Sequence, residues 1–193
     1  MTEVDIRLAG VADLPAILAI ESVCFDEDQQ WSKSSWRYDI GDDSTNVLVA
    51  VMDGAVVAAS SVHLAGLTAD LHTIETLPQW RGIGLATLLI ARGMAWAQER
   101  GATEMLLEVR VGNPAQALYA DLGFTPLYER TNYYGPGLNA VVMRRSLNTA
   151  YRDEAPSGAE RGVGLAGTAG HPDHASEVTS GSLAPLEPHL RVK

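Results

Sequence analysis

The sequence predicts an α/β fold for residues 1–146, with about seven strands and about four helices, and a disordered tail over residues 147–193. A chain of 193 residues is long enough for one such domain with a substantial core. Apolar strand-like segments alternate with segments whose apolar residues recur at helical spacing. The tail holds four of the nine prolines and lacks either period, so it cannot bury enough apolar surface to offset its chain entropy.

The charge and the cysteine content exclude several classes of protein. Fourteen basic residues against 24 acidic ones give a net charge of −10, which argues against binding to nucleic acid. A single cysteine, Cys24, excludes an internal disulfide framework and a cysteine-rich zinc module. No apolar run reaches the ~18 residues of a membrane span, and the acidic residues 1–5 are not a secretory signal. We expect a cytoplasmic monomer or weak dimer that binds no metal and no membrane.

The N-terminal elements follow from polarity and capping. Residues 4–8 alternate in polarity and predict a strand. Asp13 is placed to cap a helix that ends at Cys24. Residues 26–45 are acidic and aromatic, and they predict a loop with a short helix.

Three apolar strands are predicted next. Residues 46–51 and 55–62 form two of them, and Asp53-Gly54 between them is a hairpin signal. Residues 69–76 form the third. These short connections indicate antiparallel neighbours.

The second half begins with the turn at Gly82 and Gly84, which opens a helix to Arg100 that Gly101 stops. Residues 104–110 form a strand. The apolar stripe of the helix consists of Leu85, Leu89, Gly93 and Trp96.

The last helix starts at Asn113-Pro114, with Asn as the cap and Pro at the first helical position, and ends at Leu122-Gly123. Two strands, at about 125–132 and 139–145, close the domain.

The turn at Gly82 and Gly84 has the features of a phosphate-binding loop. Glycine allows close approach of the backbone, and a helix N-terminus offers N–H groups and a partial positive charge. The third glycine of a dinucleotide fingerprint and the Gly-Lys-Ser/Thr of a P-loop are both missing. The glycines alone are equally compatible with a plain turn.

Glu108 is the one acid in the apolar run 105–109. Such strands are usually covered on both faces, where an ionised carboxylate is costly unless it is paired or solvated by a cleft. Desolvation would raise its pKa towards the range of a general base. The alternative is an acid that faces water or pairs with Arg110.

Tyr119 lies near the end of the last predicted helix. It either packs in the core with its hydroxyl at the surface or donates a proton to a departing thiolate. A phenol has a pKa near 10 and a thiol about 8.5, so the phenol is protonated at neutral pH.

Three motifs in a fixed order resemble the GNAT family of acetyl-CoA-dependent N-acetyltransferases. They are Gln-x-x-Gly-x-Gly from Gln79, Leu-Glu-Val-Arg at 107–110 and Leu-Tyr-x-x-Leu-Gly-Phe at 118–124, and the resemblance covers about residues 3–146. Further segments are similar to the bacterial ribosomal-protein-alanine N-acetyltransferases (RimI type), namely residues 25–31, 72–74 and 132–134.

The resemblance implies a GNAT fold with a mixed, mostly antiparallel central sheet. It also implies direct attack of a neutral amine on acetyl-CoA, with Glu108 as the base and Tyr119 as the acid that protonates the coenzyme A thiolate. Tyr133 and Tyr134 would lie in a loop over the acceptor. Asn113 would contact the pantetheine arm, or it is only a helix cap. Main-chain groups of Ile74, Glu75 and Thr76 would pair with pantetheine, and amides of Arg81, Gly82, Ile83, Gly84 and Leu85 would hold the pyrophosphate.

The first functional hypothesis is acetylation of the N-terminal α-amino group of a protein, such as a ribosomal protein, that begins with Ala or Ser. An α-amino group has a pKa near 8 and needs less help to deprotonate than a lysine at about 10.4. One alternative is an acetyltransferase for a small amine or a lysine. Another is a degenerate acyl-CoA-binding module for regulation or interaction, because the connection from Ile74 to Gly82 is shorter than is usual in the family.

Other side chains leave two interpretations open. The eight acids within residues 21–53 either attract a cationic amine or basic peptide, or form a solvated face. Trp31 and Trp36 either form the wall of a peptide cleft or anchor their loop. Glu75 is a second candidate base, and His72 is expected to pack against its strand.

Overall fold

The protein is described here by a computed structural model, in which residues 3–148 are placed. Within these residues the strands are β1 (Asp5–Leu8), β2 (Thr45–Met52), β3 (Ala55–Ala65), β4 (Thr68–Thr76), β5 (Glu104–Arg110), β6 (Thr125–Arg130) and β7 (Ala140–Ser146). The helices are α1 (Leu14–Cys24), α2 (Lys33–Gly41), α3 (Leu85–Glu99) and α4 (Ala115–Asp121), with 3-10 turns η1 (Val11–Asp13), η2 (Glu27–Gln29) and η3 (Pro78–Trp80).

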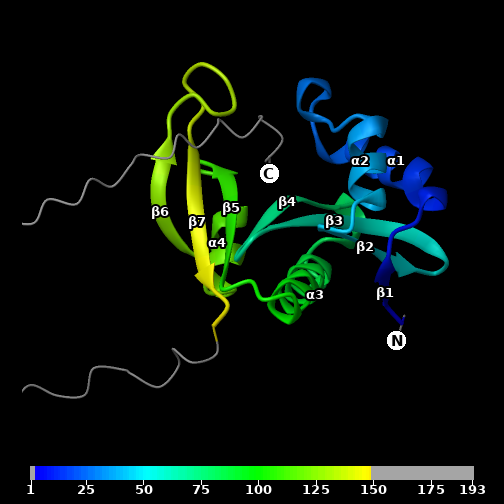
Figure 1. Cartoon of the computed structure of the whole chain (residues 1–193). Coiled ribbons are helices and arrows are strands. Elements are labelled where there is room, and N and C mark those ends of the chain that lie inside the picture. Colours follow the sequence, from blue (N-terminus) through cyan, green and yellow to red (C-terminus); the bar gives the residue numbers. More distant parts are fainter. Residues whose placement is uncertain (1–2, 149–193) are drawn as a thin grey trace, which may run out of the picture. The chain divides into compact units, whose positions relative to one another are not determined.

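The strands form one sheet in the order β1-β2-β3-β4-β5-β7-β6 (Figure 1). Every neighbouring pair is antiparallel except β4 and β5, which are parallel. The predicted mixed, mostly antiparallel sheet is therefore confirmed. The predicted hairpin is also present, because Asp53 and Gly54 both have positive φ, 51° and 79°, as a type I′ turn requires.

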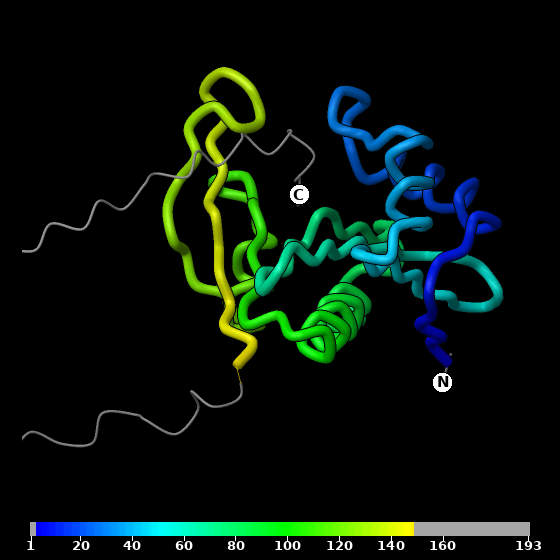
Figure 2. Tube along the Cα trace, in the orientation of Figure 1, coloured from blue at the N-terminus to red at the C-terminus, as the bar shows by residue number. Residues whose placement is uncertain are grey.

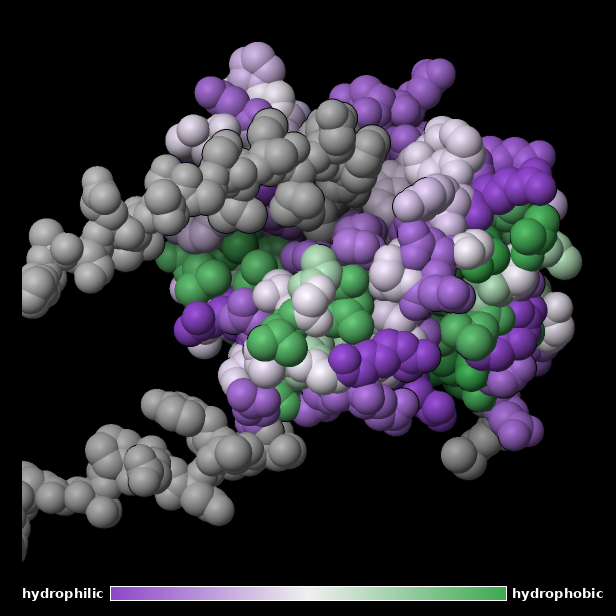
Figure 3. Space-filling view, in the orientation of Figure 1, coloured by the Kyte–Doolittle hydropathy of each residue, from purple (hydrophilic) through white to green (hydrophobic). Residues whose placement is uncertain are grey.

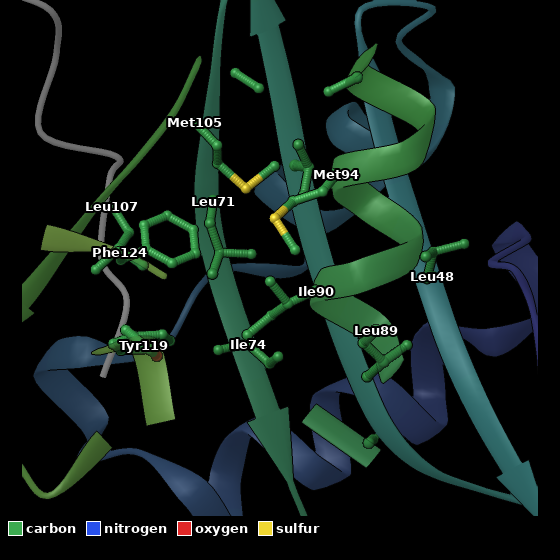
Figure 4. Close-up of a cluster of buried hydrophobic side chains, with 14 of the residues drawn as sticks. Leu48, Leu71, Ile74, Leu89, Ile90, Met94, Met105, Leu107, Tyr119 and Phe124 are labelled. Carbon is green, nitrogen blue, oxygen red and sulfur yellow. The ribbon is translucent and has the colours of Figure 1, made fainter. Parts of the chain in front are cut away.

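The two faces of the sheet carry separate clusters of buried side chains. Helix α3 packs on β2, β3 and β4, and Figure 4 shows Leu71 and Ile74 of β4 facing Ile90 and Met94 of α3. Helices α1 and α2 lie on the other face, where Trp36 is fully buried. The amphipathic helices thus cover both faces of the central strands.

Strands β4 and β5 separate after a short paired region. Their register runs only from Thr68 opposite Glu104 to Asp70 opposite Leu106, and beyond these residues the two strands diverge (Figure 2). Strand β4 continues to Thr76 without a strand partner on this side among the described residues. Its backbone groups along this edge are available to a ligand.

Two details of the sequence prediction need correction. Asp13 does not cap α1, because it sits in the preceding turn with helical φ and ψ. Its carboxylate instead accepts from the N–H of Gly10 and from the guanidinium of Arg7, each at 2.8 Å. The predicted tail lies outside the described residues except for Leu147 and Asn148. Leu147 is buried, and its N–H donates to the carbonyl of Thr103 at 2.8 Å.

The outer surface offers no dominant apolar patch on the face seen in Figure 3. The exposed apolar residues there form separate patches among hydrophilic ones. Large exposed apolar side chains come from several elements, among them Leu8, Tyr38, Ile83, Leu127 and Tyr128. The separated strands are therefore the more informative place to search for a site.

Candidate functional site

A cavity of about 750 Å³ is the main candidate site. Its walls come from the ends of α1 and β4, the glycine turn, the start of α3, the region of α4, and the loop before β7. This volume lies within the ~300–1,000 Å³ typical of small-molecule sites. Ten predicted site residues line it, namely Ile74, Glu75, Thr76, Arg81, Gly82, Gly84, Leu85, Asn113, Tyr119 and Tyr134. Four others do not, namely Trp31, Ile83, Glu108 and Tyr133.

One end of the cavity has the backbone geometry of an anion-binding turn. Gly82 and Gly84 have φ of +79° and +89°, values that side chains with a Cβ rarely adopt. Gly84 caps α3 without a side-chain hydrogen bond, so the first-turn N–H groups of α3 have no capping side chain. Leu85, Ala86 and Thr87 of that turn line the cavity. The backbone donors and the helix dipole together fit a pyrophosphate.

The end of β4 is already partly engaged within the protein. The carbonyl of Thr76 accepts from Arg81 Nε at 3.0 Å and from Cys24 Sγ at 3.4 Å. This carbonyl therefore has internal partners, whereas Ile74 and Glu75 precede it on the edge that β5 leaves uncovered.

Asn113 directly precedes Pro114, the N-cap residue of α4. Its Oδ1 accepts from the N–H of Ala115 at 2.9 Å, which favours the capping interpretation. Because Asn113 also lines the cavity, a contact with pantetheine is still compatible with this role.

Tyr119 is almost fully buried and faces the cavity. Its ring meets Phe124 edge to face, with centroids 6.2 Å apart, at the margin of the core cluster (Figure 4). Burial raises the pKa of the phenol above its usual value. The hydroxyl therefore carries its proton at neutral pH and can donate it.

Glu108 is a buried carboxylate, and one of its two oxygens has no hydrogen-bond partner among the described residues. Arg130 Nη1 donates to its Oε1 at 2.9 Å, and its Oε2 has no hydrogen-bond partner among the described residues. Burial raises the pKa of Glu108, the hydrogen bond and charge of Arg130 oppose this rise, and nearby Asp70 adds to it. The ion pair of Glu108 is with Arg130 and not with Arg110, the partner that the sequence offered. Arg110 is exposed and lines the cavity.

The loop before β7 links Glu108 to the cavity. The Arg130 guanidinium lies over the ring of Tyr133 at 4.4 Å, and Tyr133 meets Tyr134 edge to face at 4.9 Å. Tyr134, which lines the cavity, donates its hydroxyl hydrogen to the carbonyl of Glu108 at 3.0 Å. This loop and β5 thus hold each other in place beside the cavity.

Trp31 packs beside the sheet rather than in the cavity wall. Its ring lies 5.2 Å from that of Trp36 and 5.9 Å, edge on, from that of His72. His72 stacks on His63 at 5.1 Å, and its Nδ1 is 3.5 Å from a carboxylate oxygen of Asp39. These contacts favour the anchoring interpretation of Trp31.

Five of the eight acids of residues 21–53 fall into two groups. Glu21 and Asp39 are buried and accept hydrogen bonds within the fold, so they do not belong to an exposed acidic surface. Asp26, Glu27 and Asp28 are exposed on the segment between α1 and α2, and Asp26 lines the cavity. A negative potential at the cavity is therefore supplied by this segment.

Glu75 is a buried carboxyl beside another carboxyl. It is 3% exposed, and neither of its oxygens receives a hydrogen bond from an N–H or O–H group of the described chain. Burial, followed by the charge of Glu21, raises the pKa of Glu75 to about 11. Glu75 is therefore protonated at neutral pH.

The described residues offer neither a cluster of metal ligands nor a membrane-spanning helix. Between residues 3 and 148, no group of three or more His, Cys, Asp or Glu side chains could hold a metal ion. The helices of this part of the chain are too short or too polar to cross a membrane.

Comparison with known proteins gives consistent matches. The acetyltransferase (GNAT) family matches residues 14–124. A ribosomal protein bS18-alanine N-acetyltransferase of Haemophilus influenzae is 39% identical over 79 residues, which are 39% of this chain and 54% of that protein. The protein of the same name from Salmonella typhimurium is 29% identical over 130 residues, 67% of this chain and 86% of the other. The crystal structure of the ribosomal-protein-S18-alanine N-acetyltransferase from Escherichia coli matches with a TM-score of 0.68 and 25% identity, over 79% of this chain and 99% of that one.

Proposed function

The chain belongs to the acetyltransferase (GNAT) family and is an acetyl-CoA-dependent N-acetyltransferase, and on this premise we propose that it acetylates the α-amino group of a protein N-terminus that begins with Ala or Ser. A ribosomal protein is the acceptor that the names of the relatives suggest. The observation that carries the proposal is Glu108, whose buried carboxylate has one unpaired oxygen and whose backbone carbonyl accepts from Tyr134, a residue that lines the same cavity as Tyr119.

Glu108 serves as the general base. The amine must lose a proton before its lone pair can attack the thioester carbonyl carbon. The unpaired Oε2 takes that proton through a water molecule, because Glu108 does not line the cavity. Its raised pKa brings the carboxylate closer to the pKa of an α-amino group, which is about 8, so that proton transfer is less uphill.

Its protonation state makes Glu75 the less suitable base. With a pKa of about 11 it already holds a proton at neutral pH and cannot accept another. The carboxyl group that lines the cavity is therefore the less suitable base, although Glu108 lies behind the cavity wall.

Tyr119 serves as the general acid. When the tetrahedral intermediate collapses, the carbon–sulfur bond breaks and the electron pair stays on sulfur. The phenol gives its proton to this thiolate, which yields coenzyme A and the acetylated amine. Burial keeps the phenol protonated until then.

The test is release of coenzyme A from acetyl-CoA with a panel of acceptors. The panel holds peptides that begin with Ala, Ser or Met, a peptide with a blocked N-terminus and one lysine, and a polyamine. We expect release with the free Ala and Ser N-termini alone. Release with the lysine peptide or the polyamine alone would keep the chemistry and overturn the acceptor.

A further inference from the structure

Two buried acids outside the proposed mechanism meet where α1 packs on β4. Glu21 of α1 and Glu75 of β4 are 1% and 3% exposed. Two ionised carboxylates in such a place would repel each other strongly, so at most one of them carries a charge.

The hydrogen bonds show which of the two is ionised. Glu21 Oε1 accepts from the backbone N–H of Trp31 at 2.7 Å, and Oε2 accepts from the indole Nε1 of Trp36 at 3.1 Å. Two N–H donors stabilise the charged form of Glu21. Glu75 has no such donor, and the group that faces it is the Glu21 carboxylate. Two carboxyl groups form a hydrogen bond only when one holds a proton. The proton therefore resides on Glu75.

This pair connects the floor of the cavity to its wall. Glu75 lines the cavity, and so do Phe25, Asp26 and Gln29 of the segment that follows α1. The far end of that segment is Trp31, whose N–H is held by Glu21. Gln30 Nε2 also donates to the carbonyl of Phe25 at 2.9 Å, which joins the two ends of this segment.

We propose that Glu75 is a positioning residue, which donates a hydrogen bond to Glu21 and thereby fixes residues 25–31, the segment that supplies Phe25, Asp26 and Gln29 to the acceptor-side wall of the cavity. That Glu75 holds this segment in place does not depend on the proposed function. Only the assignment of the segment to the acceptor side rests on the proposed function. The pyrophosphate end, at Gly82 and Gly84, lies outside α1 and β4, on the turn that opens α3.

The first test separates binding of the two substrates. Glu75→Gln keeps an N–H donor for Glu21, whereas Glu75→Leu has similar size and none. Loss of a hydrogen bond to a charged group should raise the KM of the acceptor peptide about tenfold or more in Glu75→Leu, and kcat should change less. Glu75→Gln should remain within about threefold of the wild type. Affinity for coenzyme A, measured by calorimetry, should change less than the peptide KM in both variants, because only main-chain groups of β4 are assigned to pantetheine.

The second test needs no turnover. Amide hydrogen exchange should become faster across residues 25–31 in Glu75→Leu and stay at the wild-type rate in Glu75→Gln. Exchange in α3 should be the same in all three proteins, which also shows that the variants are folded. Glu99→Gln, an exposed acid on α3, is the control.

The outcomes are distinct. Unchanged exchange and unchanged peptide KM in Glu75→Leu would overturn the proposal, as would equal loss in Glu75→Gln and Glu75→Leu. Faster exchange without turnover on any N-terminal peptide would leave the positioning role in place and contradict the proposed function instead.

Discussion

At the scale of single residues, the proposed chemistry depends on how the fold distributes protons among three acidic groups. Glu108 has one oxygen without a hydrogen-bond partner, and Arg130 offsets part of the rise in pKa that burial causes. Tyr119 and Glu75 have no such cation in the environment that sets their pKa, and both hold their protons. One group is thus prepared to accept a proton and another to donate one.

Replacement of Glu108 should remove the base without loss of the fold. Glu108→Gln keeps the size of the side chain and an oxygen for Arg130, and it should lower kcat by about 10²–10⁴ at pH 7. Coenzyme A release in initial-rate assays measures the effect. Glu104→Gln, on the same strand and half-buried, is the matched control and should keep wild-type activity. Equal losses in both variants would contradict the role of Glu108.

Replacement of Tyr119 tests the acid. Tyr119→Phe removes only the hydroxyl group and should lower kcat, by about 10²–10⁴ if protonation of the thiolate limits the rate. Affinity for acetyl-CoA should be retained, because the ring still fills its place against Phe124. Tyr128→Phe, at an exposed tyrosine on β6, should be silent in the same assay. Full activity of Tyr119→Phe would show that another group, or water, protonates the sulfur.

Arg130 should set the acidic limb of the pH profile. Its hydrogen bond and charge lower the pKa of Glu108. Arg130→Gln should therefore raise that pKa further, and since Glu108 acts in its ionised form, the fall of kcat/KM at low pH should begin at a higher pH. The loss should be larger at pH 6 than at pH 8. Arg144→Gln is the control, because Arg144 Nη1 lies 3.9 Å from Oε2 of Glu104 and pairs with that residue instead of Glu108. A limb that stays in place would separate Glu108 from the observed titration.

At the scale of elements, the site depends on close packing of α3 against the sheet. Gly93 of α3 faces Val62 of β3, and a Cβ at this position would lie 2.7 Å from Val62 Cγ2. This contact lets the helix lie close to the strands, and the same helix presents its first turn to the cavity.

Substitution of Gly93 should therefore lower the free energy of unfolding. The methyl group of Gly93→Ala overpacks the contact, and the cost of about 1–3 kcal/mol exceeds the gain of up to about 1 kcal/mol in helix propensity. Urea unfolding measures the difference. Gly41→Ala, where a Cβ meets no atom within 4 Å, should be neutral or slightly stabilising. A stabilised Gly93→Ala would show that α3 can move away from Val62 without cost.

At the scale of the whole domain, the parting of β4 and β5 creates a cavity that contacts α1, β4, α3 and the loop before β7 at once. A ligand that fills it connects elements far apart in the sequence. Its binding should stabilise the folded state as a unit.

Coenzyme A should therefore raise the melting temperature of the protein. At a concentration 100 times its Kd the stabilisation is about 2.7 kcal/mol. Pantetheine, which lacks the pyrophosphate, should give a smaller shift at equal concentration, because it leaves the turn at Gly82 and Gly84 unused. Thermal unfolding followed by circular dichroism measures both. Equal shifts would indicate that this turn does not bind phosphate.

Much of the domain could be predicted from local patterns. Local patterns placed all seven strands and α1, α3 and α4 within a few residues, and Asp53-Gly54 indicated the hairpin, whereas α2 was expected only as a short helix somewhere in residues 26–45. Local chemistry also identified Gly82 and Gly84 as a helix-opening turn, and Glu108 as an acid inside a buried strand. These features depend on neighbours within a few residues along the chain, so a short stretch of sequence contains the necessary information.

The partners of these residues could not be predicted in the same way. Arg130 reaches Glu108 because β7 lies between β5 and β6, and Glu75 is neutral because it is buried and because α1 brings Glu21 onto β4. The preference of Asp13 for Arg7 over α1, and the opening between β4 and β5, belong to the same class. Strand order and register bring together residues that are distant in the sequence, and local periodicity carries no record of that order. The residue types were therefore visible in the chain, whereas their charge states and contacts arise from the packing of the sheet.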